Sequence, residues 1–85
     1  MRLDKYFKVS RIIKRRSVAN EAAAAGRVSI NGKQAKPSSE VKPGDTLDLL
    51  LGGRHILFRV ESVAETVRKE DAEAMYTVLT EDRRA

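Results

Sequence analysis

Most of the positive charge of this chain lies in its first 36 residues. Ten of the 17 Lys and Arg residues fall there, against only Asp4 and Glu21, so this stretch has a net charge of +8. The remaining residues carry −3, because the whole 85-residue sequence has a formal net charge of +5. Such an uneven distribution indicates one cationic face and one mildly acidic face, and it predicts a polyanion, most simply a nucleic acid, as partner.

The spacing of these cations suits phosphate groups. If residues 2–13 are helical, Lys5, Lys8 and Arg11 stand three residues apart and form a ridge that can follow successive phosphates. The basic run 14–16 extends this ridge to the start of a second expected helix, whose amide groups add partial positive charge. We predict the centre of binding at this junction. Three further cations would close the other side of a groove if the following strands fold against the helices: Arg27, Lys33 and Lys36.

The sequence shows no constellation of residues typical of catalysis or of metal binding. It has no cysteine, and His55 is the only histidine, so neither a nucleophile–base pair nor a histidine metal site is indicated. Glu70, Asp71 and Glu73 lie among basic residues and lack the spacing of a calcium loop. A domain of 85 residues also has little room for a buried active site. We therefore expect a binding protein that is not an enzyme and has no catalytic residue, metal or cofactor.

The aromatic content favours one mode of nucleic-acid recognition. Only four aromatic residues occur, and no expected strand shows the exposed aromatic pairs that stack unpaired bases. Recognition of the shape and phosphates of folded RNA fits better. Tyr6 and Phe7 are adjacent on the first helix and point about 100° apart, so Phe7 can enter the core while Tyr6 borders the surface, and core packing is the expected role of both.

No targeting or membrane-spanning segment is indicated. The chain is charged from Arg2 onward, and no apolar run approaches the roughly 20 residues that a membrane helix needs. The absence of cysteine fits a reducing compartment. We expect a cytoplasmic protein with no membrane partner.

Two helices are expected to position the cations. Apolar residues at helical spacing, from Leu3 through Phe7 to Ile13, predict a short amphipathic helix. Ser17 is the expected N-cap of a second helix, which Gly26 ends as a C-terminal cap. The helices thus place the basic run between them.

The rest of the chain has the pattern of short strands. Val28 and Ile30 alternate with polar residues, and Asn31-Gly32 is a strong signal for a hairpin turn into residues 33–36. Strands are then expected at 46–51, 55–63 and 75–80, with a charged helical or irregular connection at 64–74. The predicted fold class is α+β, with two N-terminal helices packed on a small, mostly antiparallel sheet.

Five short motifs together carry a resemblance to a known family. In order they are Arg2-Leu3-Asp4-Lys5, Arg15-Arg16-Ser17-Val18-Ala19, Ala25-Gly26-Arg27-Val28-Ser29-Ile30-Asn31-Gly32, Lys36-Pro37-Ser38-Ser39 and Val41-Lys42-Pro43-Gly44-Asp45. On these motifs, residues 1–51 resemble the RNA-binding domain named for small-subunit ribosomal protein S-four. The resemblance implies an αL-type motif whose helices and short sheet grip structured RNA. Residues 52–80 are then expected as a C-terminal β extension of the same compact unit, and 81–85 as a flexible tail.

The whole chain resembles a stand-alone branch of this family that acts in bacterial ribosome-associated quality control. That resemblance implies binding to the dissociated large ribosomal subunit, at rRNA and peptidyl-tRNA, in support of RqcH-dependent alanine tailing of stalled nascent chains. It further implies RqcH as a partner, and the chain is expected to be a monomer off the ribosome. Two alternatives remain: a heat-shock-type ribosome-recycling factor, and a protein-interaction adaptor that uses the acidic segment 61–73.

The expected RNA-binding residues come from both lines of reasoning. Matching positions in the family motifs contribute Arg2, Asp4, Lys5, Arg15, Arg16, Ser17, Arg27, Asn31 and Lys33. The spacing of the cations adds Lys8, Arg11, Lys14 and Lys36. Asp4 is an unusual member of a phosphate-binding surface, and we expect it to cap the first helix or to orient a neighbouring Arg, with direct contact to RNA as the sharper alternative.

Overall fold

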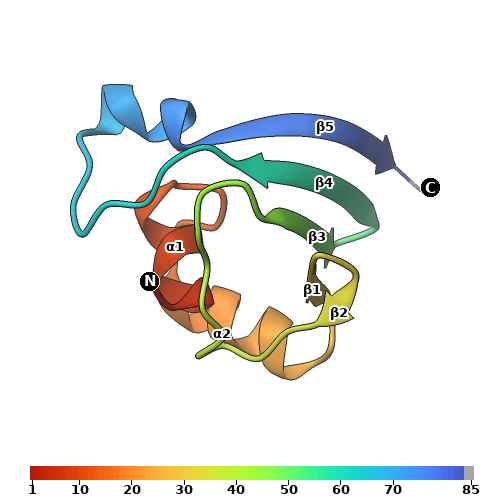
Figure 1. Cartoon of the computed structure of the whole chain (residues 1–85). Coiled ribbons are helices and arrows are strands. Elements are labelled where there is room, and N and C mark those ends of the chain that lie inside the picture. Colours follow the sequence, from red (N-terminus) through yellow and green to blue (C-terminus); the bar gives the residue numbers. More distant parts are fainter. Residues whose placement is uncertain (84–85) are drawn as a thin grey trace.

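A computed structural model describes residues 1–83 and shows an α+β fold, as predicted. The two α-helices come first and the strands follow, with one 3₁₀ helix before the last strand (Figure 1). Their bounds are α1 (Leu3–Val9), α2 (Arg16–Ala24), β1 (Val28–Ile30), β2 (Lys33–Gln34), β3 (Thr46–Leu51), β4 (Arg54–Val60), the 3₁₀ helix η1 (Lys69–Met75) and β5 (Tyr76–Arg83).

The five strands form one antiparallel sheet in the order β2-β1-β3-β4-β5. The long pairing of β3 with β4, from Thr46↔Arg59 to Leu51↔Arg54, joins the first part of the chain to the C-terminal strands. The sheet curls, and α1 and α2 lie on its concave side (Figure 1). One side of each helix is thus buried, and the other is left for the solvent.

The core lies between α1 and the sheet. Leu3 and Phe7 of α1 are fully buried, as are Leu47 and Leu49 on the inner face of β3. Tyr6 is also fully buried, which confirms the expected core packing of both aromatics and shows that Tyr6 does not border the surface. Its hydroxyl donates a hydrogen bond of 2.8 Å to the carbonyl oxygen of Met75, which satisfies the one polar atom of the ring. Burial accordingly raises the pKa of Tyr6 well above its ordinary value.

The first helix is shorter than its apolar pattern suggests. It ends at Val9, and the amide of Ser10 donates to the carbonyl oxygen of Tyr6 at 2.9 Å. Arg11 then takes a left-handed conformation with φ 62°, which turns the chain out of the helix. The predicted helical ridge from Lys8 to Arg11 is therefore wrong.

The second helix begins one residue before its predicted cap. Arg15 occupies the N-cap position with no side-chain cap hydrogen bond, and Ser17 lies inside α2, so the prediction of a Ser17 cap is wrong. At the other end, Gly26 has φ 78°, a conformation that favours glycine and confirms the predicted helix stop. A Cβ at Gly26 would also lie 2.7 Å from the Nε2 of Gln34.

The predicted hairpin turn is confirmed. Asn31 and Gly32 both have positive φ, of 51° and 84°, and they join the paired residues Ile30 and Lys33. The Asn31 side chain also ties this hairpin to the start of β3. Its Oδ1 accepts from the Thr46 amide at 2.9 Å, and its Nδ2 donates to Asp45 at 3.0 Å.

The C-terminal strands are shifted from their expected bounds. β4 ends at Val60 instead of residue 63, and the expected charged connection 64–74 is irregular up to Arg68 and then helical, in η1, from Lys69. β5 runs to Arg83, which pairs with Arg54, so the predicted strand end at Thr80 is wrong. The last two residues of the expected tail, 84–85, lie outside the described residues.

Candidate nucleic-acid interface

Asp4 is a buried carboxylate in the most basic part of the molecule. It lies in the first turn of α1, and only 2 % of the residue is exposed. Its backbone amide donates to the Pro37 carbonyl oxygen at 3.1 Å, and the amide of Leu3 donates to Ser39 at 2.9 Å. The loop between β2 and β3 thus holds the start of α1 in place.

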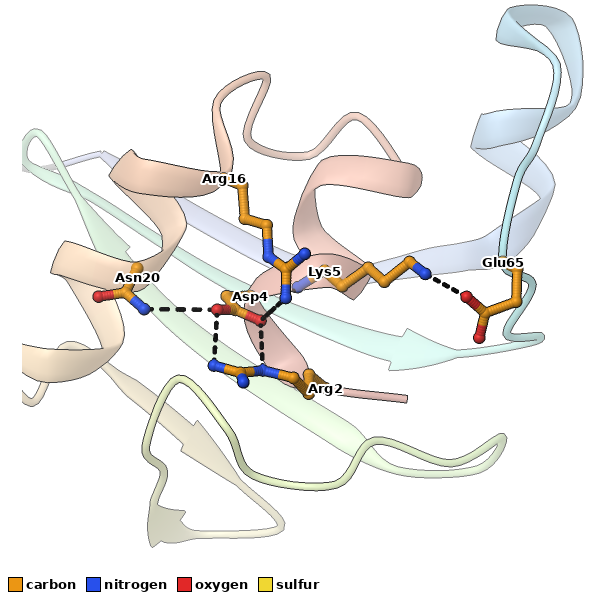
Figure 2. Close-up of polar contacts among 6 residues, drawn as sticks. All are labelled: Arg2, Asp4, Lys5, Arg16, Asn20 and Glu65. Atoms are coloured by element: carbon orange, nitrogen blue, oxygen red, sulfur yellow. Dashed lines mark hydrogen bonds and ion pairs between the residues drawn. The ribbon is translucent and has the colours of Figure 1, made fainter.

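Three side chains converge on the Asp4 carboxylate (Figure 2). Arg2 forms two bonds with it, from Nε to Oδ1 and from Nη2 to Oδ2, both of 3.2 Å. Arg16, at the start of α2, donates from Nη2 to Oδ1 at 3.3 Å, and Asn20, one turn later, donates from Nδ2 to Oδ2 at 3.3 Å. We call Arg2, Asp4, Arg16 and Asn20 the Asp4 cluster.

The electrostatics of the cluster keep Asp4 ionised. Burial alone would raise the pKa of the Asp4 carboxyl. The hydrogen bonds from Arg2, Asn20 and Arg16 outweigh that effect and hold the pKa below its ordinary value of 3.8. The expectation that Asp4 orients a neighbouring Arg is confirmed, whereas the N-cap position of α1 belongs to Arg2.

The cluster presents two oriented guanidinium groups to the solvent. The side chains of Arg2 and Arg16 are 52 % and 45 % exposed, whereas that of Asp4 is 3 % exposed. An arginine has five N–H donors, so each guanidinium retains donors that do not contact Asp4. These donors can bind phosphate oxygens, and their positions are fixed before a ligand arrives. The surface has the chemistry of a polyanion-binding site.

A second group of cations lines a groove of about 330 Å³ beside α1. Lys8, Arg11 and Lys14 lie on one side, and the segment 65–67 after β4 lies on the other. We call this the basic groove. At its edge, Lys5 forms an ion pair with Glu65 (Figure 2). Arg11 reaches the same groove as Lys8 although the two are not on one helix, because the left-handed turn at Arg11 folds the chain back.

The other predicted residues lie elsewhere or have structural partners. Arg15 and Ser17 are exposed near the start of α2. Arg27 lines a separate groove of about 740 Å³ near the β3–β4 turn, and not the one formed by Lys8, Arg11 and Lys14. Lys33 and Lys36 are exposed on and just after β2. The structure therefore gathers two groups of predicted residues and leaves the strand cations apart from the basic groove.

Two participants were missed in the sequence. Asn20 lies in an alanine-rich helix and has no charge, so nothing in the pattern singled it out. Glu65 belongs to a segment that was expected only as an acidic connection. The available signal for Asn20 was its spacing: it stands one helical turn after Arg16 and thus faces the same side.

The structure gives no sign of a metal site or a membrane helix in the part it describes. No group of three or more His, Asp or Glu residues within 1–83 is placed to hold an ion. His55 is instead hydrogen-bonded to Asp48 on the neighbouring strand. In the same range, no helix has the length and apolar character that a membrane span requires.

Comparisons with known proteins agree with this geometry. The model of the S4 domain family matches residues 1–47, which include both helices and the hairpin. The chain is 53 % identical over 83 residues to the RQC P-site tRNA stabilizing factor of Bacillus subtilis, with 98 % of this chain and 96 % of that protein covered. The chain belongs to the S4 domain family, among the RQC P-site tRNA stabilizing factors.

Further relatives place this S4 domain protein in a wider group. The factor of the same name from Listeria innocua is 51 % identical over 83 residues, which cover 98 % of this chain and 90 % of that protein. Among solved structures, heat shock protein 15 of Vibrio cholerae, described as trimeric, superposes with a TM-score of 0.85 at 32 % identity. That match covers 92 % of this chain and 80 % of the other. The family relationship confirms the predicted S-four-type fold, and it indicates an RNA-binding protein with a role in ribosome quality control.

Proposed function

We propose that this chain binds the dissociated large ribosomal subunit through rRNA and peptidyl-tRNA, and holds the tRNA while a stalled nascent chain is extended. It would act in the cytoplasm beside RqcH, which supplies the alanyl-tRNA for C-terminal alanine tailing. No bond would be made or broken by its own side chains. Its contribution would be positional, through contacts with RNA that keep the peptidyl-tRNA in place.

The observation that supports this proposal most strongly is the Asp4 cluster. Two guanidinium groups are held on one carboxylate, and both face the solvent with free donors. Bidentate arginine groups match the geometry of phosphate oxygens, and fixing them beforehand reduces the entropy lost on binding. The near full-length similarity to proteins named for stabilizing a P-site tRNA supplies the biological setting.

The proposal can be tested by sucrose-gradient sedimentation of ribosomal subunits from bacterial cells that express the tagged chain. We expect the wild-type chain in the large-subunit peak, and a several-fold smaller share of Arg16→Ala there. Lys42→Ala is the matched control, because it also removes one exposed cation but lies outside both groups of site residues. Equal sedimentation of all three chains would remove Arg16 from the interface, and absence of the wild type from the large-subunit peak would contradict the proposal.

A second candidate function is that of a heat-shock-type recycling factor, which also binds large subunits. The fold similarity to heat shock protein 15 favours it. The two functions differ in their product. In cells lacking this chain, loss of alanine tails from a stalled reporter protein would support the quality-control function. Normal tails together with accumulated large subunits carrying peptidyl-tRNA would support the recycling function. RNA-independent capture of a protein through segment 61–73 would instead support the adaptor function.

A further inference from the structure

The basic groove contains a negative group as well as positive ones. Glu65 lies on the side opposite Lys8 and Lys14, and its carboxylate pairs with Lys5. Within residues 1–83, no hydrogen bond or ion pair engages the side chains of Lys8, Arg11 or Lys14. The groove therefore has three cations without a partner, and at its edge a fourth cation, Lys5, is paired with the carboxylate of Glu65.

We propose that the basic groove is a second phosphate-binding site, and that the Glu65 carboxylate occupies the position at Lys5 that an RNA phosphate takes when it binds. Glu65 is thus an internal competitor that RNA must displace. This inference rests on the proposed RNA-binding function, and it adds a residue that sets the affinity and selectivity of that binding.

The Lys5–Glu65 pair is suited to exchange. The Glu65 side chain is 79 % exposed and that of Lys5 is 32 % exposed, so the pair is largely in water and contributes little to stability. Glu65 also lies in a segment without regular secondary structure, between β4 and η1. The carboxylate can leave without loss of a helix or strand. The hydrogen bond and charge of Lys5 lower the pKa of Glu65, so the competitor stays ionised near neutral pH.

A phosphate has an advantage over the carboxylate once RNA is already bound elsewhere. RNA held on the Asp4 cluster presents its neighbouring phosphates at a high effective concentration. The side chains of Lys8, Arg11 and Lys14 attract those phosphates into the groove, where one phosphate can replace the Glu65 carboxylate at Lys5. A short or unstructured polyanion that reaches only the groove has no such assistance. Glu65 therefore weakens the binding of polyanions that reach only the basic groove and do not also contact the Asp4 cluster.

The test compares Glu65→Gln with Glu70→Gln, since both remove one exposed negative charge but Glu70 lies in η1, away from the residues that line the groove. The probe is purified large ribosomal subunits at several salt concentrations. We expect Glu65→Gln to bind about two- to fivefold more tightly than wild type, the range set by a weak exposed ion pair. Its salt slope should match that of wild type, because Lys5 contacts a phosphate in both complexes once RNA is bound.

The Lys5→Ala background separates the possible outcomes. There, Glu65→Gln should give no more gain than Glu70→Gln, because the competition at Lys5 has been removed. The inference is overturned if Glu65→Gln and Glu70→Gln behave alike in the wild-type background, or if the gain persists with Lys5→Ala. If the wild-type chain binds no large subunits at all, the proposed function itself fails. The two failures are thus distinguishable.

Discussion

The Asp4 cluster and the basic groove both collect cations around one carboxylate, but they do so in opposite ways. Asp4 is buried and accepts hydrogen bonds from two arginines whose outer faces remain exposed. Glu65 is exposed and pairs with a single lysine, while the other cations of the groove have no partner within the described residues. The Asp4 carboxylate thus orients two cations, whereas the Glu65 carboxylate neutralises one.

The difference shows that the role of an acidic residue in a basic surface depends on its burial. A buried carboxylate cannot be displaced by a phosphate, so it fixes the direction of its arginines and leaves their free donors for the ligand. An exposed carboxylate is in the position that a phosphate itself could take. We therefore expect removal of the negative charge to weaken RNA binding at Asp4 and to strengthen it at Glu65.

The largest effect is expected for Asp4→Asn. This change leaves the guanidinium groups of Arg2 and Arg16 beside a neutral amide, with a donor facing donors. The free energy of unfolding should fall by about 1 to 3 kcal/mol, since a buried charge network is broken. RNA affinity should fall by about tenfold, because oriented groups become mobile. Chemical denaturation and large-subunit binding measure the two effects.

Asp71→Asn is the control for this change, because Asp71 is an exposed acid in η1. It should leave the free energy of unfolding within about 0.5 kcal/mol of wild type. An Asp4→Asn chain with wild-type stability and wild-type affinity would mean that the carboxylate does not organise the arginines.

A smaller difference in large-subunit affinity should separate substitutions in the Asp4 cluster from substitutions in the basic groove. Arg16→Ala removes an oriented guanidinium and should reduce large-subunit affinity by about tenfold, whereas Lys14→Ala removes a mobile ammonium and should cost about threefold. Both variants should keep the fold, with a loss in unfolding free energy below about 1 kcal/mol. Titration of labelled chain with large subunits measures this. Equal losses would show that orientation by Asp4 adds nothing to the charge.

The smallest effect is the pH dependence of stability. Because the folded-state pKa of Asp4 is below its ordinary value of 3.8, ionised Asp4 stabilises the fold above that value. This contribution is lost as the pH falls from about 4 through the folded-state pKa. The difference in unfolding free energy between wild type and Asp4→Asn should therefore shrink in this acidic range. A difference that stays constant down to about pH 2 would contradict the assigned pKa shift.

Local sequence patterns predicted much of the fold. The Asn31-Gly32 turn and the stop at Gly26 were predicted correctly, because each needs a backbone conformation that few residue types adopt. The sequence pattern did not predict the early end of α1. Ile13 is buried, as expected for an apolar residue that continues the helix, but the chain reaches it through a left-handed turn at Arg11. A buried position alone does not show which backbone path leads to it.

The site was predictable in composition but not in geometry. Arg2 and Arg16, which the family motifs had singled out, both contact Asp4 in the structure, and the place of Asp4 among cations indicated a special role. The contact with Asn20 spans 16 residues and depends on how α1 packs against α2. Lys5 and Glu65 are 60 residues apart, and they meet only because the segment after β4 returns to α1. Such long-range contacts leave no periodic trace in the sequence.

The most direct test of the central role of Asp4 is a mutant cycle on large-subunit affinity, measured at a temperature where every variant is folded. Asp4→Asn is introduced into the wild-type chain and into the Arg2→Ala/Arg16→Ala double variant. If Asp4 acts by orienting the two arginines, its substitution should cost about tenfold in the wild-type chain and less than about twofold in the double variant. An equal cost in both backgrounds would contradict the account.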